Sequence, residues 1–206
     1  MRSSCFFGMV CVEENLAKEA YEPLKKAVTL SPDNPYYNYA FGAVAVERDD
    51  PRESVPYFAK YHLLKPEDPR GRFALGMAYY YSHDLVSARS ELESAARHKE
   101  TQVGSYYFLA RVANEEGNLE EARGYIQHCL SAKPDYADAY AELGTLEMKE
   151  RQYTKAEEAF RSAVKIDRGT TLQISISWSY TREQTTPEPK LRPKTLRRSN
   201  PNALKG

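Results

Sequence analysis

Few side chains in this sequence have the type and spacing that catalysis or metal binding requires. The sequence has no Gly-x-Ser-x-Gly turn, no glycine-rich phosphate loop ending in Lys-Ser or Lys-Thr, and no His-Glu-x-x-His. Cys11 and Cys129 fall at close-packing positions, which favours buried, unreactive thiols over a nucleophile. The histidines are scattered without paired metal-ligand spacing: His62, His83, His98 and His128. We therefore expect no catalytic residue, no metal site and no cofactor.

The composition of the chain excludes further classes of function. The 206 residues include 29 lysines and arginines and 29 aspartates and glutamates, so no net charge attracts nucleic acid or an anionic membrane. The longest apolar run, at 39–46, is far shorter than the roughly 18 residues of a membrane span. Three cysteines suit a reducing compartment. A short apolar run follows Arg2 as in a secretory signal, but Glu13 and Glu14 interrupt it. We predict a cytoplasmic protein with no nucleic-acid or membrane partner.

The sequence repeats with a period of about 34 residues, and this period predicts the elements that position the side chains. One series of mostly small residues is Gly8, Gly42, Gly76, Ala110 and Gly144. A second is Ala20, Ser54, Ala88, Ala122 and Ala156. Large apolar residues recur at Leu24, Phe58, Leu92, Ile126 and Phe160. Prolines close three units, at Pro32, Pro66 and Pro134.

Apolar residues at spacings of three and four indicate two helices in each unit. The small residues fall where the two helices approach closely, so the unit is a helix hairpin that buries its apolar face by stacking on its neighbours. Pro23 and Pro56 lie inside expected second helices, where we expect bends. The five units together occupy residues 1–170, as 1–34, 35–68, 69–102, 103–136 and 137–170.

This pattern resembles the tetratricopeptide repeat over about four-fifths of the chain. The resemblance implies an all-α, right-handed superhelical solenoid of five helix hairpins. Three residues depart from the pattern: Ser4 and Cys11 replace large packing residues, and Glu147 replaces an aromatic residue.

Residues 171–206 form an irregular, basic C-terminal tail in this scheme. Leu172, Ile174, Ile176 and Trp178 alternate with polar residues, as in a strand. Residues 182–206 are polar and rich in proline, which predicts disorder. Three interpretations of the tail are open. It has no structural role, or its apolar segment covers the exposed face of the fifth unit, or this segment mediates self-association.

The resemblance also places a concave groove along the first helices. Tyrosine and arginine are typical of binding surfaces because a large, semi-rigid side chain loses little entropy on binding. Some of these rings could instead bridge neighbouring units and serve stability alone. Arg111 could bind a ligand carboxylate, or it could pair with Glu115 one turn along. The candidate groove residues are Tyr36, Tyr39, Arg70, Phe73, Met77, Tyr80, Tyr81, Tyr107, Arg111 and Asn114.

The sequence therefore predicts a non-catalytic protein–protein interaction scaffold that binds a partner peptide or segment in an aromatic groove. The alternatives are a regulatory or assembly segment of a larger, possibly enzymatic protein, and self-association through the uncapped end faces. Of the residues that grip carboxylates in chaperone-binding members of the family, only Arg70 has a match here, so that partner is not expected.

Overall fold

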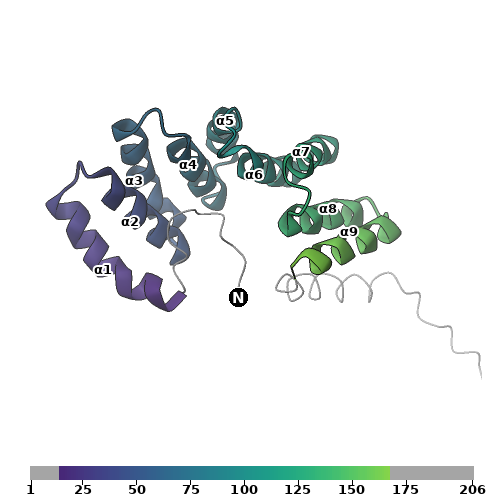
Figure 1. The fold of residues 1–206 in the computed structure, drawn as a ribbon, viewed down its shortest axis with the longest axis horizontal. Helices are drawn as coiled ribbons and strands as arrows, with labels where there is room; N and C mark the ends of the chain where they lie inside the picture. Colours follow the sequence, from purple (N-terminus) through teal and green to yellow (C-terminus); the bar gives the residue numbers. More distant parts are fainter. Residues whose placement is uncertain (1–13, 168–206) are drawn as a thin grey trace, which may run out of the picture. The chain divides into compact units, whose positions relative to one another are not determined.

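A computed structural model describes residues 14–167, and within this range the secondary structure is entirely helical (Figure 1). The first helix is α1 (Glu14–Leu30), and four helix pairs follow it. The pairs are α2 (Pro35–Glu47) with α3 (Pro51–Leu64), α4 (Pro69–Tyr81) with α5 (Leu85–Ala95), α6 (Gln102–Glu115) with α7 (Leu119–Ala132), and α8 (Ala137–Lys149) with α9 (Tyr153–Ile166). The first helix expected in unit 1–34, with Ser4 and Cys11, and the tail at 171–206 lie outside the described residues.

Three helices begin with the same two-residue signal, an Asn or Asp followed by proline. Asn34 accepts hydrogen bonds from the amides of Tyr36 and Tyr37, and Asp50 accepts one from the amide of Glu53. Asp68 does the same for Arg70. The side-chain oxygen satisfies an amide that has no partner within the helix, and proline at the first helical position has no amide to satisfy.

The turn inside each of the four hairpins that follow α1 places one residue in the left-handed region, at the same position of the repeat. Asp49, His83, Gly117 and Arg151 have φ values of 64°, 62°, 83° and 60°. Consecutive members of this series are separated by one repeat length. A left-handed residue just after a helix reverses the chain direction within a short turn, which is why each second helix packs back on its first.

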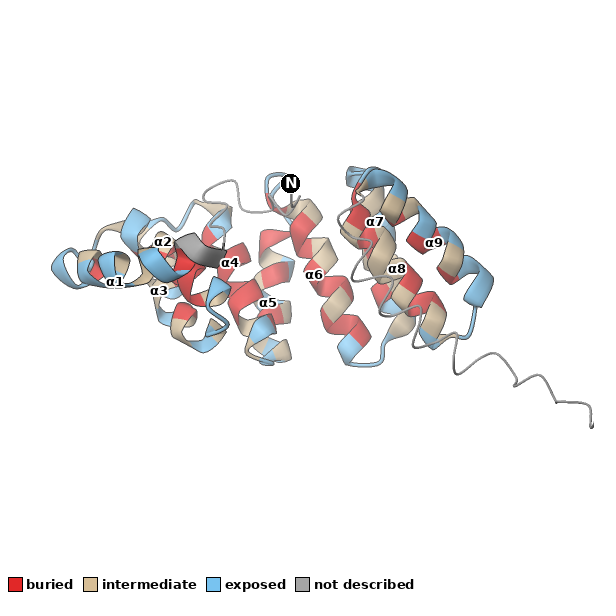
Figure 2. Ribbon diagram, turned by 90° about the horizontal axis from the view of Figure 1, so that it is seen from below, coloured by how far each residue is buried: buried red, intermediate tan, exposed pale blue. Residues whose placement is uncertain are grey.

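Helix packing follows the small and large series of the sequence. A Cβ atom added to Gly42 would lie 2.8 Å from the ring of Phe58, and one added to Gly144 would lie 2.5 Å from the ring of Phe160. Both helices of a pair contact each other, each second helix contacts the next first helix, and α6 also contacts α4 and α8. Figure 2 shows the result for α6, which is buried or half-buried over almost its whole length. The hairpin prediction is confirmed for these residues.

The two prolines at which bends are expected, Pro23 and Pro56, lie inside helices α1 and α3, and both helices continue through them. The thiol of Cys129 is fully buried, and burial raises its pKa to about 12, so it is protonated at neutral pH and a poor nucleophile.

Candidate functional site

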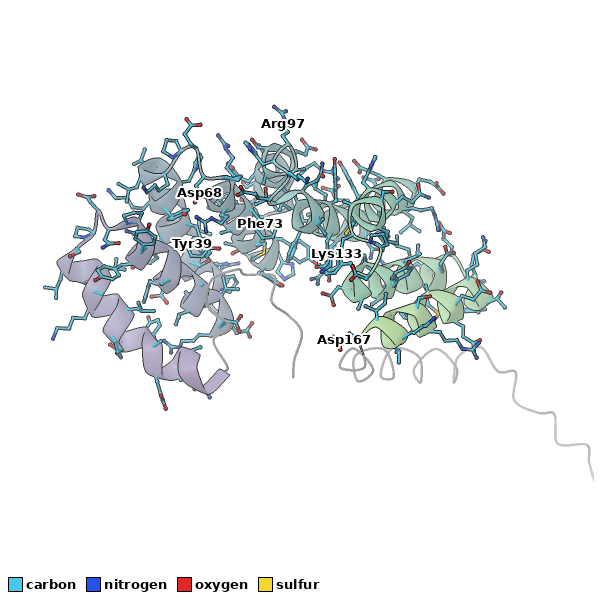
Figure 3. The ribbon with its side chains drawn as sticks, in the orientation of Figure 1. Tyr39, Asp68, Phe73, Arg97, Lys133 and Asp167 are labelled. Atoms are coloured by element: carbon cyan, nitrogen blue, oxygen red, sulfur yellow. The ribbon has the colours of Figure 1, made fainter. Side chains whose placement is uncertain are left out.

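The ten candidate groove residues all lie on first helices, in α2, α4 and α6. Figure 3 shows Tyr39 and Phe73 on the side of the helices opposite to Arg97, which follows the second helix α5. The surface made by the ten residues is called the groove face below.

Five of the ten candidate residues are buried, namely Asn114 and four residues with aromatic or apolar side chains. Tyr39, Phe73, Met77 and Tyr80 are 7%, 4%, 2% and 6% exposed. Tyr39 packs against the ring of Tyr61, with centroids 4.9 Å apart. The rings of Phe73 and Tyr80 lie 6.0 and 5.6 Å from the ring of Phe108 in the next first helix. These side chains bridge helices because the rings are long enough to fill the space between them.

The accessible part of the groove face consists of other residues. Tyr36 is 60% exposed and Tyr81 is 41% exposed. Tyr107 and Arg111 in α6 are partly buried, and the Arg70 side chain is 45% exposed. Tyr81 and Tyr107 remain close to the buried cluster, since their rings lie 5.8 and 5.3 Å from that of Phe108. A ligand on this face would therefore contact ring edges and cations. The accessible rings themselves pack against a buried layer of aromatic side chains.

Arg70 is held by a local ion pair at the start of α4. Its Nη2 atom lies 2.5 Å from Oδ2 of Asp68, and its Nε atom donates to Oδ1 at 2.9 Å. The hydroxyl of Tyr61 donates to Oδ2 of the same carboxylate at 2.5 Å. The Arg70 guanidinium, with these other donors, lowers the pKa of Asp68 to about 2. An open hollow lies beside this pair, and it is lined by residues 64–70 and Glu100.

Asn114 is occupied by contacts between helices and is 8% exposed. Its Nδ2 atom donates to Oε1 of Glu142 at 2.5 Å, and the ammonium of Lys149 donates to its side-chain and backbone oxygens. Tyr80 occupies the same position one repeat earlier, and its hydroxyl donates to Glu115 in α6. Both positions thus connect successive first helices, and these contacts engage the side chain of Asn114.

Arg111 has a different environment. Its guanidinium carbon lies 4.8 Å from the ring centroid of Tyr80, 5.7 Å from that of Tyr107 and 5.8 Å from that of Phe108. It makes no hydrogen bond or ion pair with any residue in the described part of the chain, and the pair with Glu115 does not form. The aromatic rings hold a cation whose donors are not engaged by any other side chain or backbone group of residues 14–167.

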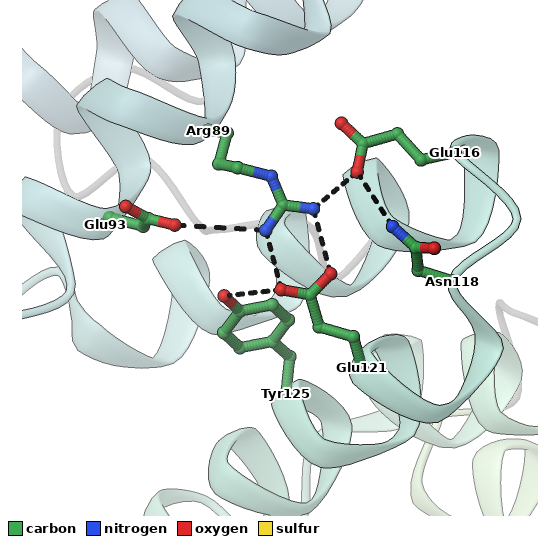
Figure 4. Close-up of polar contacts among 6 residues, drawn as sticks. All are labelled: Arg89, Glu93, Glu116, Asn118, Glu121 and Tyr125. Carbon is green, nitrogen blue, oxygen red and sulfur yellow. Dashed lines mark hydrogen bonds and ion pairs between the residues drawn. The ribbon is translucent and has the colours of Figure 1, made fainter.

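A set of arginines connects neighbouring repeats, and none of them is among the candidate residues predicted from the sequence. Arg89 in α5 contacts Glu116 at 2.5 Å and Glu121 at 2.8 Å, both in the next hairpin (Figure 4). Arg123 occupies the same position one repeat later and contacts Glu150 at 2.6 Å. The arginine and its glutamate partner both recur at the repeat period, and this spacing is the signal that was available in the sequence.

Neither a metal-binding cluster nor a membrane-spanning helix is found within residues 14–167. No group of three or more His, Cys, Asp or Glu side chains is arranged to hold a metal ion in this range. None of the helices in the same range is long and apolar enough to cross a membrane.

Comparison with known proteins agrees with the repeat architecture. Two tetratricopeptide repeat family models match the chain, one over residues 73–134 and the other over residues 113–173. Together with the helix hairpins, these matches show that the chain contains tetratricopeptide repeats. No curated protein sequence matches the chain significantly.

Solved structures show the same fold at low sequence identity. TTC0263, a thermophilic tetratricopeptide repeat protein of Thermus thermophilus, has a TM-score of 0.68 and 14% identity, over 82% of this chain and 92% of its own. YrrB, a tetratricopeptide repeat protein with an unusual peptide-binding site, has a TM-score of 0.58 and 21% identity, over 80% and 84%. MamA has a TM-score of 0.62 and 19% identity, over 77% and 92%. The protein is therefore an all-α repeat solenoid.

Proposed function

We propose that the repeat array is a non-catalytic protein–protein interaction scaffold, which binds a peptide or segment of a partner along the groove face. The observation that carries this proposal is the position of its accessible aromatic side chains. Tyr36, Tyr81 and Tyr107 lie on the first helices of three consecutive hairpins and are exposed or partly exposed. Aromatic side chains on a rigid support dominate binding energies because they bury much area at a small entropy cost.

The buried aromatic layer supports the proposal in a second way. Tyr39, Phe73 and Tyr80 pack between helices and fix the backbone from which the accessible rings project. A ligand that meets preorganised side chains loses less ordering entropy than one that meets a mobile surface. The peptide-binding site described for YrrB is a precedent for this use of the fold.

The experiment selects ligands from a library of random short peptides displayed on phage, with the full-length chain as bait. The dissociation constants of the selected peptides are then measured by isothermal titration calorimetry. We expect Tyr81→Ala to weaken binding by about tenfold or more, the usual loss at an aromatic contact that dominates an interface.

Tyr153 provides a matched control because it is 39% exposed, against 41% for Tyr81, and lies at the start of the second helix α9. Tyr153→Ala should leave the dissociation constants unchanged. Equal effects of the two substitutions, or an effect of Tyr153→Ala alone, would reject the groove face as the binding surface.

A further inference from the structure

The free donors of Arg111 define the chemistry that the groove face can recognise. A guanidinium carries five N–H donors in a planar fork. In Arg111 these donors have no hydrogen-bond acceptor among residues 14–167, although the side chain is partly buried among Tyr80, Tyr107 and Phe108. Ring faces stabilise the positive charge but leave the donors unsatisfied. A partly buried cation in this state favours a ligand that supplies an acceptor.

The carboxylates near Arg111 are engaged with other groups. Glu115 accepts a hydrogen bond from the Tyr80 hydroxyl. Glu142 accepts one from the side-chain amide of Asn114. Burial, together with the nearby charge of Asp167, raises the pKa of Asp138. No carboxylate among residues 14–167 caps Arg111, so an incoming carboxylate would find donors that these residues leave available.

We propose that Arg111 binds the side-chain carboxylate of an Asp or Glu within the partner segment. This inference rests on the proposed function of the groove face. A carboxylate matches the guanidinium fork with two parallel hydrogen bonds, which a single carbonyl cannot do. Arg111 lies in α6, and first helices precede and follow it in α4 and α8. A peptide can extend in both directions from this point, so an internal acidic residue fits better than a terminal carboxylate.

The surroundings also limit the charge of the segment. Glu115 and Glu142 would repel a run of acidic residues, whereas one carboxylate is balanced by Arg111 itself. The side chains next to that carboxylate would meet the rings of Tyr81 and Tyr107. The preferred ligand is thus a mainly apolar or aromatic segment with one acidic residue.

The test uses peptides selected on the full-length chain from the random phage library. We expect the selected sequences to share one Asp or Glu flanked by apolar residues. Arg111→Gln should weaken binding of such a peptide by about tenfold to a hundredfold, the range for a hydrogen bond to a charged group. Arg111→Lys keeps the charge but loses the fork, so it should weaken binding by a smaller factor. Circular dichroism of both variants checks that they fold.

A double-mutant cycle gives the decisive measurement. The acidic residue of the peptide is replaced by its amide, and binding to the wild-type and Arg111→Gln proteins is compared. We expect the amide peptide to lose no further affinity on Arg111→Gln, because the shared contact is already gone. A peptide with the same residues and its only carboxylate at the C-terminus should bind more weakly.

The outcomes separate this inference from the proposed function. If Tyr81→Ala weakens binding but the cycle shows no coupling to Arg111, or if the selected peptides carry no acidic residue, the carboxylate site is rejected and the groove remains. Stronger binding of the terminal carboxylate would overturn the assignment to an internal side chain. If no peptide is selected, or if no groove substitution affects binding, the proposed function fails as well.

Discussion

Arg123 in α7 donates a hydrogen bond from Nη1 to Oε1 of Glu147 in α8, and Glu147 is the one charged residue that is buried within the described range. Glu147 is 4% exposed, and its Oε2 atom has no hydrogen-bond partner. The sequence pattern expected an aromatic side chain here. The arginine of the preceding repeat explains how the position accepts a carboxylate instead, since a buried charge requires a partner.

Arg123→Ala should lower the free energy of unfolding by about 2–3 kcal/mol, because it leaves the Glu147 carboxylate buried without its cation. This value is below the loss for a fully enclosed pair because the Arg123 side chain is 23% exposed. Urea unfolding followed by circular dichroism measures the change. The double substitution Arg123→Met with Glu147→Leu should recover most of the loss, since it removes both charges.

Arg89→Ala is the matched control for this pair. Its partners Glu116 and Glu121 are 27% and 40% exposed and can be solvated when the arginine is removed. The loss should therefore be about 1 kcal/mol or less. Equal losses for Arg89→Ala and Arg123→Ala would show that the burial of Glu147 does not determine the effect.

Gly144→Ala should destabilise the fifth hairpin, since the added Cβ would lie 2.5 Å from the ring of Phe160. Forcing a methyl group into a packed helix crossing costs about 1–3 kcal/mol. Gly124 lies in helix α7 with no atom within 4 Å of an added Cβ, so Gly124→Ala should instead stabilise the protein by about 0.5–1 kcal/mol. Thermal unfolding of the two variants should shift in opposite directions, and a shift of the same sign would contradict the packing argument.

Asp68→Asn should make the stability depend less on pH. The folded-state pKa of Asp68 is about 2, below the unfolded value of about 4, so the ionised carboxylate stabilises the fold above pH 4 and this contribution is lost as the pH falls toward 2. Asparagine keeps the cap on α4 but loses the charge. We expect a loss of about 1 kcal/mol at pH 7, a value discounted because Arg70 is 45% exposed, and a smaller loss near pH 3.

The comparison needs a neighbouring carboxyl group as a control. Glu67 is exposed and adjacent to Asp68, so Glu67→Gln should change the free energy of unfolding by a few tenths of a kcal/mol at both pH values. A loss for Asp68→Asn that is the same at pH 7 and pH 3 would show that the ion pair with Arg70 is not its origin.

The sequence was sufficient to predict the packing of each hairpin. Gly42 with Phe58 and Gly144 with Phe160 are small and large residues in register, and such pairs depend on local helix geometry that every repeat shares. The repeat period therefore determined which side chains meet within a hairpin.

The direction of the groove tyrosines could not be predicted in the same way. Tyr80 is buried because the ring of Phe108, in the next first helix, lies beside it. Tyr81, the next residue, is 41% exposed. Whether Arg111 pairs with Glu115 also depends on another helix, because the hydroxyl of Tyr80 in α4 donates a hydrogen bond to Glu115. Contacts between first helices depend on how closely the repeats stack, which a single sequence does not specify.

The left-handed turn residues give a last prediction, because one repeat uses glycine where three others do not. Arg151 is exposed and has a φ of 60°, a conformation that costs residues with a Cβ atom about 1 kcal/mol. Arg151→Gly removes this strain, although glycine also gives the unfolded chain more freedom. We expect a net gain of about 0.5 kcal/mol in the free energy of unfolding. Gly117, with a φ of 83°, should show the reverse, a loss of about 1 kcal/mol in Gly117→Ala.

Arg151→Ala separates the backbone effect from loss of the arginine side chain. Alanine removes the side chain beyond Cβ but keeps the strain, so this variant should be no more stable than the wild-type protein. Urea unfolding of the three variants should thus rank Arg151→Gly above wild type, with Gly117→Ala below it. If Arg151→Ala stabilises the protein as much as Arg151→Gly does, the gain comes from removing a charge, and the turn geometry is not responsible.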